Sequence, residues 1–305
     1  MQSVMIQLAV SGIAMGFIYA LVAVQITLMF NSTGLLNFAQ ENVIALGGYV
    51  FVGTYLMSMG FGNIPAVLST LITLACFGVF IALIIFIPLR TRHRLIAVIA
   101  TVMLGQIINE SVVLIWGPLA LRPEGFLAGV VRFNDITIAI SHIYIIIVSI
   151  AVIVVLQIVL KSTKVGKAMT CVAQNKTAAA LMGINVKVSM SITIAICFAI
   201  CALIGMVTAP IFTVTQNIAS MIALKGFCAA VIGGFGKLPY AIIGGLLLGV
   251  IENYAGFFLP AVFRDVVSFS LMIIFMLFAP NGFAGIIKHL QYQKAIAMER
   301  AREAV

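Results

Sequence analysis

Charged residues are scarce in this chain. Only 8% of its 305 residues are Asp, Glu, Lys or Arg, while 63% are hydrophobic and the mean hydropathy is +1.24. Soluble domains carry about 25% charged residues, and a much smaller fraction cannot cover a water-facing surface. The composition therefore excludes a soluble enzyme, a disordered chain and a coiled coil. It indicates a protein built from membrane-spanning segments.

Basic residues are also missing from the start of the chain. No Lys, Arg or His precedes Arg90, and Glu41 is the only acid in that stretch. A cleavable signal peptide begins with a basic region. The first apolar run is therefore expected to be retained as a helix.

Motifs for metal or nucleotide chemistry are absent as well. The five cysteines are not spaced as zinc ligands or as a disulfide framework, so no metal site is expected. Gly166-Lys167 and Gly236-Lys237 lack the remaining residues of a phosphate-binding loop. Catalytic residues are not expected, and any ATP chemistry must come from another subunit.

What the chain does contain is a series of apolar runs, each close to the roughly 20 residues that cross a bilayer as a helix. The runs are continuous rather than alternating, which favours helices over a membrane barrel. The sequence thus predicts an all-α polytopic membrane protein with a single transmembrane domain over 1–305. The nine predicted spans are Val4–Phe30, Phe38–Met59, Ile64–Pro88, Leu95–Trp116, His142–Leu160, Met190–Phe212, Ala219–Phe235, Pro239–Leu259 and Arg264–Pro280.

The net charge of +9 does not indicate nucleic-acid binding in a membrane protein. The positions of the basic residues relative to the spans instead predict the orientation of the chain in the membrane. Thirteen basic residues fall on one predicted side, in the loops after Arg90 and Leu160, at Lys237 and in the tail, against three on the other. The positive-inside rule places the first side in the cytoplasm. The C-terminus is then cytoplasmic and, with nine spans, the N-terminus lies outside. The tail 284–305 mixes apolar and basic residues, which suits an amphipathic helix on the inner leaflet.

Two short segments are similar to each other. Ile44–Tyr49 and Ile222–Phe227 share the pattern Ile-Ala-Leu-x-Gly-aromatic, and each follows a polar break in the chain. The two lie in spans that cross in opposite directions, as expected of an inverted repeat with broken helices. Chance similarity between Ile/Ala/Gly-rich stretches is the alternative. The repeats would cover about 1–160 and 190–283, separated by a cytoplasmic loop at 161–189.

That cytoplasmic loop is alanine-rich and is expected to form one helix from Lys167 to Met182, closed by Gly183. Small side chains on such a helix permit close approach of another protein. A helix lying on the bilayer surface is the alternative.

Polar residues inside the predicted spans are candidates for the translocation pathway, because they are costly in a bilayer and usually face the interior of the bundle. Lys225 is expected to pair with Glu252 or with Glu110. Such a pair would either contact the substrate along the pathway or hold two helices together. As a further alternative, the Lys225 side chain extends to the membrane interface. The pathway candidates are Asn37, Gln40, Asn42, Gln106, Asn109, Lys225 and Glu252.

Four motifs, in order along the chain, give a specific resemblance. Thr33–Gln40 resembles the opening signature of the LivH-type branched-chain amino acid permeases of ATP-binding-cassette importers. Val165–Val186 is similar to that family's coupling-helix loop, and Lys225–Glu252 to its glycine-rich stretch. Phe278–Gly282 resembles its closing turn.

The resemblance implies a permease subunit of an ATP-driven importer for leucine, isoleucine and valine in the bacterial inner membrane. It implies a second homologous permease, two ATPase subunits that bind ATP and Mg, and an extracytoplasmic solute-binding protein. In the coupling loop it points to Ala173, Ala178, Ala179 and Gly183 as ATPase contacts. Urea, short amides or nucleosides are alternative substrates. An ion-coupled secondary transporter and a passive channel are the alternative classes.

Overall fold

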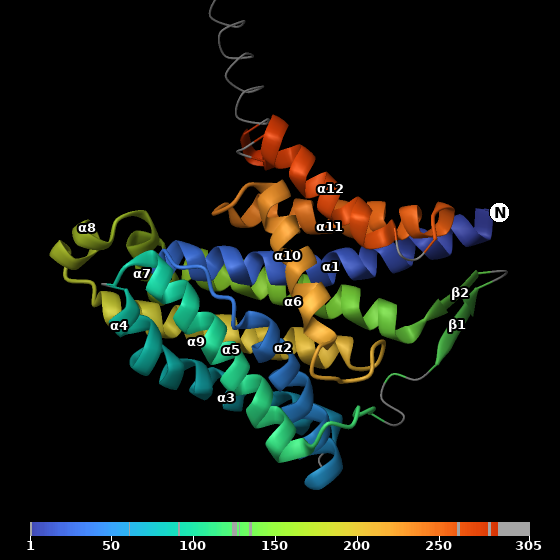
Figure 1. Cartoon of the computed structure of the whole chain (residues 1–305), viewed down its shortest axis with the longest axis horizontal. Helices are drawn as coiled ribbons and strands as arrows, with labels where there is room; N and C mark the ends of the chain where they lie inside the picture. Colours follow the sequence, from blue (N-terminus) through green and yellow to red (C-terminus); the bar gives the residue numbers. More distant parts are fainter. Residues whose placement is uncertain are drawn as a thin grey trace, which may run out of the picture.

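The computed structural model describes residues 2–60, 62–90, 92–123, 127, 129–133, 136–260, 263–279 and 282–285. These residues are almost entirely helical, in agreement with the all-α prediction (Figure 1). The helices of the first part are α1 (Gln2–Thr33), α2 (Gln40–Tyr49), η1 (Val50–Ser58), α3 (Asn63–Ile81), η2 (Ala82–Phe86), α4 (Ile87–Leu89) and α5 (Arg94–Trp116). Those of the second part are α6 (Ile140–Ser162), α7 (Lys164–Gln174), α8 (Lys176–Leu181), α9 (Val186–Thr208), α10 (Ile218–Gly233), α11 (Leu238–Phe258) and α12 (Phe263–Phe278).

Each predicted span corresponds to a helix or to consecutive helices, but not all are equally long. Seven of the described helices are long and apolar enough to cross a membrane. The other two runs form α10, of 16 residues, and α2, of 10 residues, which the π-helix η1 continues for 9 more. The chain is therefore a multi-pass membrane protein, while the count of nine complete spans stays a prediction.

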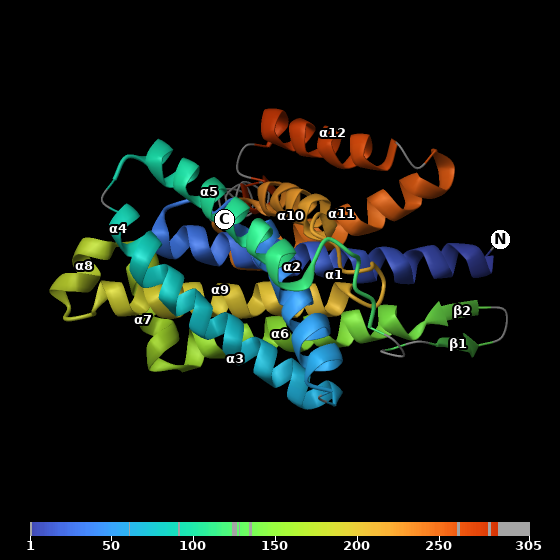
Figure 2. The same ribbon diagram turned by 60° about the horizontal axis from the view of Figure 1, so that its bottom comes forward.

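The long helices α1 and α9 form the centre of the bundle. Both are apolar on all sides and mostly buried, whereas only a small share of α6 and of α12 is buried. A helix that is apolar all round belongs inside a bundle or in lipid. Figures 1 and 2 show α1, α6 and α9 running side by side, with α12 at the periphery.

Glycines bring α1 and α11 into close contact. A Cβ built on Gly16 would lie 2.9 Å from the Cα of Leu246, and one on Gly249 would collide with Gly16 itself. The Gly12-x-x-x-Gly16 and Gly245-x-x-x-Gly249 pairs face each other across this contact. Small residues at such spacing allow two membrane helices to approach closely, so these pairs serve the packing of the bundle.

The two helices that follow the polar breaks, α2 and α10, meet in the interior of the bundle. Helix α9 packs against α2 and α3, as α1 packs against α10 and α11. Similarly, α2 contacts α5 and α10 contacts α12. This arrangement is consistent with two inverted halves, and the proposed limits of the halves remain a prediction.

The loop between α5 and α6 contains an antiparallel hairpin that the sequence did not suggest. It pairs β1 (Val130–Phe133) with β2 (Ile136–Ala139). Closer to α5, Leu121 exchanges two backbone hydrogen bonds with Val214, at 2.8 and 3.0 Å. The segment that follows α5 is thus attached to the segment that precedes α10.

The two ends of the bundle carry different elements. Helices α7 and α8 lie at one end, and the N-terminus and the β1–β2 hairpin lie at the other (Figures 1 and 2). Asn31, near the end of α1, donates a hydrogen bond to the Gly236 carbonyl, which places the α10–α11 turn at the end with α7 and α8. The predicted amphipathic tail lies outside the described residues beyond Gly285.

The loop 161–189 was predicted to contain one helix, and this detail is wrong. The chain turns at Asn175, whose φ and ψ are −154° and 109°, and α7 and α8 lie on either side of it. The Asn175 side chain accepts hydrogen bonds from the Thr177 and Ala178 amides, both at 3.0 Å. An asparagine in this position starts a new helix rather than continuing the previous one.

Candidate functional site

The most prominent polar feature of the bundle is an ionic network around Lys225 of α10. The Lys225 ammonium lies 2.7 Å from Glu252 Oε1 of α11 and 2.7 Å from Asp265 Oδ1 of α12. The Lys225 and Glu252 side chains are only 9% and 8% exposed, whereas that of Asp265 is 42% exposed. One cation therefore joins two carboxylates, one of which is buried.

Neighbouring residues extend the network without neutralising it. Ser268 donates a hydrogen bond to Glu252 Oε2 at 3.4 Å. Arg264 donates to the neutral Asn253 amide oxygen at 3.1 Å. Within the described part of the chain, no carboxylate lies at ion-pair distance from Arg264, and its buried Nε has no hydrogen-bond partner.

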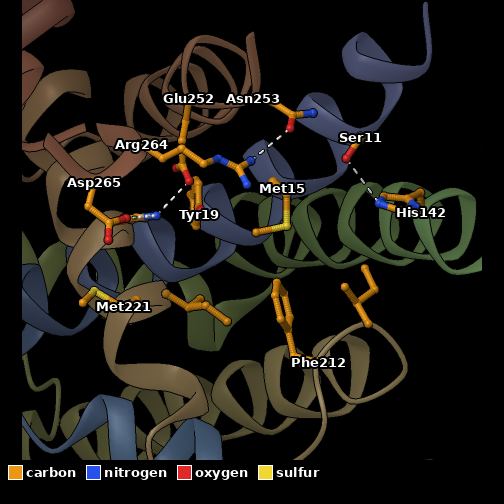
Figure 3. Close-up of a pocket in the computed structure, with 13 residues that line it drawn as sticks. Ser11, Met15, Tyr19, His142, Phe212, Met221, Glu252, Asn253, Arg264 and Asp265 are labelled. Atoms are coloured by element: carbon orange, nitrogen blue, oxygen red, sulfur yellow. Dashed lines mark hydrogen bonds and ion pairs between the residues drawn. The ribbon is translucent and has the colours of Figure 1, made fainter. Parts of the chain in front are cut away.

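These side chains line a cavity of about 460 Å³ between α1, α6, the α9–α10 segment, α10, α11 and α12. Figure 3 shows Glu252, Asn253 and Arg264 on one wall, with Phe212 and Met221 on the opposite wall. His142, at the start of α6, faces Ser11 of α1, with Nε2 and Oγ 3.4 Å apart. The cavity lies toward the end of the bundle that carries the N-terminus.

The pairing of Lys225 with Glu252 was one of two predicted possibilities, and the other is wrong. Glu110 is exposed on α5 and does not reach Lys225, because α5 contacts α2 on the other side of the bundle. Sequence reasoning missed Asp265. The signal was present, since Arg264 and Asp265 are adjacent charges at the start of an apolar helix, but they suggested only the edge of a span.

A second polar location is the break between α1 and α2. Asn37 and Gln40 are buried there, beside Ala223, Leu224 and Phe227 of α10, and they line a cleft of about 180 Å³. The Asn37 side chain accepts a hydrogen bond from the Ala39 amide at 3.0 Å, which shapes the turn into α2. This cleft is where the two interrupted segments of the fold meet.

The remaining pathway candidates lie at the contact of α2 with α5 or on the outer surface of α5. Asn42 packs against Gly105, and a Cβ at that glycine would come within 2.7 Å of the Asn42 amide nitrogen. Asn109 is half-buried, and Gln106 is exposed among apolar side chains. The structure thus distributes the seven candidates over three places, with Lys225 and Glu252 in the cavity.

The coupling-loop candidates divide into surface and interior residues. Ala173, Ala178 and Gly183 are exposed, and Gly183 has φ +81° as its role as a helix stop requires. Ala179 is buried in a small cluster with Val172, Val186 and Met190, so its side chain is not on the surface of the loop.

Two exposed apolar residues at the end of α8 were not singled out from the sequence. Leu181 and Met182 are 86% and 83% exposed at the extreme end of the bundle (Figure 1). The alanine-rich sequence of the loop led to the prediction that its small residues form the contact surface. Which side chains of α8 are exposed depends on how this short helix packs against its neighbours, and the sequence does not show that.

Lys176 connects this loop to the membrane helices. Its ammonium donates a hydrogen bond of 2.6 Å to the Thr33 carbonyl at the end of α1. Burial, together with the nearby positive charge of Arg90, lowers the pKa of Lys176 below its ordinary value. A cation at a helix C-terminus also interacts favourably with the helix dipole. The contact fixes α8 beside the break that contains Asn37.

Together, the long apolar helices, the interrupted helices at the centre and the helical loop of α7 and α8 at one end define a polytopic membrane transport protein. The chain belongs to a family described as the permease component of the branched-chain amino acid transport system, which matches residues 8–276. The predicted LivH-type family is therefore confirmed.

Individual relatives agree with this assignment. The chain is 30% identical to the high-affinity branched-chain amino acid transport system permease protein BraD of Pseudomonas aeruginosa, over 92% of this chain and 95% of BraD. It is 29% identical to the corresponding permease protein LivH of Escherichia coli, over 90% of this chain and 94% of LivH. A probable LivH of Methanocaldococcus jannaschii is 24% identical, over 87% and 88%. No solved structure matches the chain.

Proposed function

We propose that the chain is the permease subunit of an ATP-driven importer of leucine, isoleucine and valine. The observation that carries this proposal is the similarity over nearly the full length of relatives whose names specify branched-chain amino acids. The subunit itself breaks no bond. It offers the substrate a route through the membrane and alternates between outward and inward access.

The energy for this cycle comes from two ATPase subunits that bind ATP and Mg. The sequence of the permease contains no phosphate-binding loop, so the motor lies in a separate subunit. Exposed apolar side chains at a tip of the molecule are typical of contact surfaces. Leu181 and Met182 supply the apolar contact with the ATPase, and Ala173, Ala178 and Gly183 permit its close approach.

The orientation follows from the basic residues. Lys161, Lys164, Lys167 and Lys176 lie on or beside α7 and α8, and positive residues concentrate on the cytoplasmic side of membrane proteins. In this orientation the cavity around Lys225 opens toward the extracytoplasmic side. A solute-binding protein delivers the substrate there, at the bacterial inner membrane.

A second, homologous permease subunit completes the transporter. Gln106, and in part Asn109, would face lipid in the isolated chain, where polar groups are costly. Covering this face of α5 with a partner subunit removes that cost. The substrate would then pass from the cavity of Lys225 and Glu252 toward the cleft with Asn37 and Gln40 and the contact of α5 with α2 at Asn42.

The test is uptake of radiolabelled leucine by proteoliposomes that contain the complete transporter, together with retention of the ATPase during purification. Leu181→Arg is expected to reduce both steeply, because a charge at the centre of an apolar contact is poorly solvated. Val188→Arg is the matched control, since Val188 is also apolar and exposed near the same end of the bundle. It is expected to retain both.

Three results would contradict parts of the proposal. Full uptake and full ATPase retention in Leu181→Arg would reject the coupling surface. Leucine uptake that needs an imposed ion gradient and no ATP would instead establish a secondary transporter. Uptake of urea, a short amide or a nucleoside, with no uptake of leucine, would reject the substrate class.

A further inference from the structure

The cavity around Lys225 separates its charges in an unusual way. Lys225 is bound by two carboxylates, so the three groups Lys225, Glu252 and Asp265 carry a net charge of −1 together. Arg264 carries a charge of +1 beside them, and its side-chain hydrogen bond within the described residues goes to the neutral side chain of Asn253. The cavity wall therefore presents a negative and a positive centre that do not neutralise each other directly.

Both centres have capacity for a further partner. The guanidinium of Arg264 has five N–H donors, and in the described part of the chain its buried Nε meets no acceptor. Asp265 uses one oxygen for Lys225, and its side chain is 42% exposed although it borders the cavity. A partly buried guanidinium without a charged partner is costly, so a ligand carboxylate would be stabilised beside Arg264. The second carboxylate oxygen of Asp265 could accept a hydrogen bond from a ligand ammonium group.

The opposite wall has a different chemistry. Phe212 and Met221 lie on it (Figure 3). The cavity lining also includes the apolar side chains of Met15, Ile211 and Ile222. Small-molecule sites combine such apolar walls with a few polar groups that fix the orientation of the ligand, and a volume of about 460 Å³ lies within their usual range. Neutral urea or a short amide would use neither the separated charges nor the apolar wall.

We infer that this cavity is the outward-facing substrate site and binds an aliphatic α-amino acid as its zwitterion. Arg264 binds the α-carboxylate, Asp265 binds the α-ammonium group, and the branched side chain packs against Phe212 and Met221. The inference rests on the proposed function, which assigns the substrate class but no binding site. Lys225 and Glu252 act as positioning residues, because they fix the carboxylate of Asp265 at the edge of the cavity.

The test uses a cysteine on the apolar wall of the complete transporter in nanodiscs. Met221→Cys is introduced after the exposed native cysteines Cys76 and Cys171 are replaced by serine. The measured quantity is the rate of alkylation by N-ethylmaleimide, with and without leucine. Met59→Cys, exposed but remote from the cavity lining, is the control.

Leucine is expected to slow alkylation at position 221 and not at position 59. Two analogues test the charge recognition: 4-methylpentanoate, which lacks the ammonium group, and 3-methylbutylamine, which lacks the carboxylate. Each is expected to need at least about tenfold more ligand for half-protection, because each loses one charged hydrogen-bonding pair. Equal protection by leucine and by either analogue would overturn the inference.

Arg264→Gln adds a second measurement. It is expected to weaken protection by leucine about tenfold and to leave protection by 3-methylbutylamine nearly unchanged. A purely structural role for Arg264 would weaken both ligands equally. Arg264→Lys retains the charge and is expected to restore part of the discrimination.

Failure of this inference differs visibly from failure of the proposed function. If the wild-type transporter takes up leucine with ATP but leucine protects no residue of the cavity, the site lies elsewhere and the function stands. If the complete transporter takes up no branched-chain amino acid, the proposed substrate class is wrong.

Discussion

Replacing Lys225 with Met should destabilise the bundle because it leaves two carboxylates without their shared cation. Lys225 contacts Glu252 and Asp265 at 2.7 Å each, and its side chain is only 9% exposed. Removing one partner of a buried ion pair typically costs about 3–5 kcal/mol, since the remaining charge stays buried. Most of this cost should come from Glu252, which is 8% exposed, rather than from the more exposed Asp265.

This difference in burial predicts which second change restores stability. Glu252→Gln in the Lys225→Met background removes the buried charge and keeps the hydrogen bond from Ser268, which lies 3.4 Å from the other carboxylate oxygen. It should recover most of the lost stability. Asp265→Asn in the same background should recover less, because water already solvates that side chain.

The assay is the apparent melting temperature of the purified complex in detergent, measured by loss of the monodisperse peak on heating. The expected order is wild type, then Lys225→Met with Glu252→Gln, then Lys225→Met with Asp265→Asn, then Lys225→Met alone. Two results would refute this reasoning: an equal melting temperature for Lys225→Met and the wild type, or equal recovery of the melting temperature in both double variants. Either would show that the burial of Glu252 does not determine the cost of removing Lys225. Leucine uptake should be impaired in all three variants, because each loses the contact with Lys225 that positions the side chain at 265.

Three further predictions concern other parts of the fold. The pKa of Lys176 is lowered in the folded state, so the unfolded chain binds this proton more tightly. The free energy of unfolding should therefore rise as the pH increases toward the ordinary pKa of 10.5. Lys176→Met should make melting temperatures measured over this pH range rise less. Gly249→Ala should cost about 1–3 kcal/mol by overpacking α11 against α1, seen as a lower melting temperature. Gly62→Ala should cost less than about 1 kcal/mol, because its new Cβ would meet only the Pro65 ring at 3.9 Å, an ordinary contact distance. In intact cells, a cysteine at Thr177 should resist an impermeant thiol reagent and one at Thr137 should react; the reverse pattern would invert the orientation.

The sequence was a good guide to helices and to chemistry that depends on single residues. Continuous apolar runs predicted every long helix, because length and composition alone determine whether a segment can cross a bilayer. The polar breaks before α2 and α10 were visible as clusters of Asn, Gln, Ser and Thr. The ion pair of Lys225 with Glu252 was one of two predicted alternatives, because a charge inside an apolar span requires a partner.

The sequence could not predict features that depend on which side of a helix packs against its neighbours. Ala178 and Ala179 are adjacent and identical in type, yet one is exposed and the other is buried against Val186. Leu181 and Met182 resemble any apolar pair until the end of α8 is seen to project from the bundle. Asp265 could be assigned to the ionic network only when α10, α11 and α12 were seen to converge.

The two hydrogen bonds between Leu121 and Val214 have a consequence for communication across the outer surface. Phe212, on the cavity wall, lies two residues before Val214, and Leu121 lies in the loop that leaves α5. A protein docked on this loop and an amino acid bound in the cavity would therefore act on one connected segment of backbone. Any coupling between the two binding events is reciprocal: if a docked protein raises the affinity of the cavity for its ligand, the bound ligand raises the affinity of the loop for the protein by the same factor.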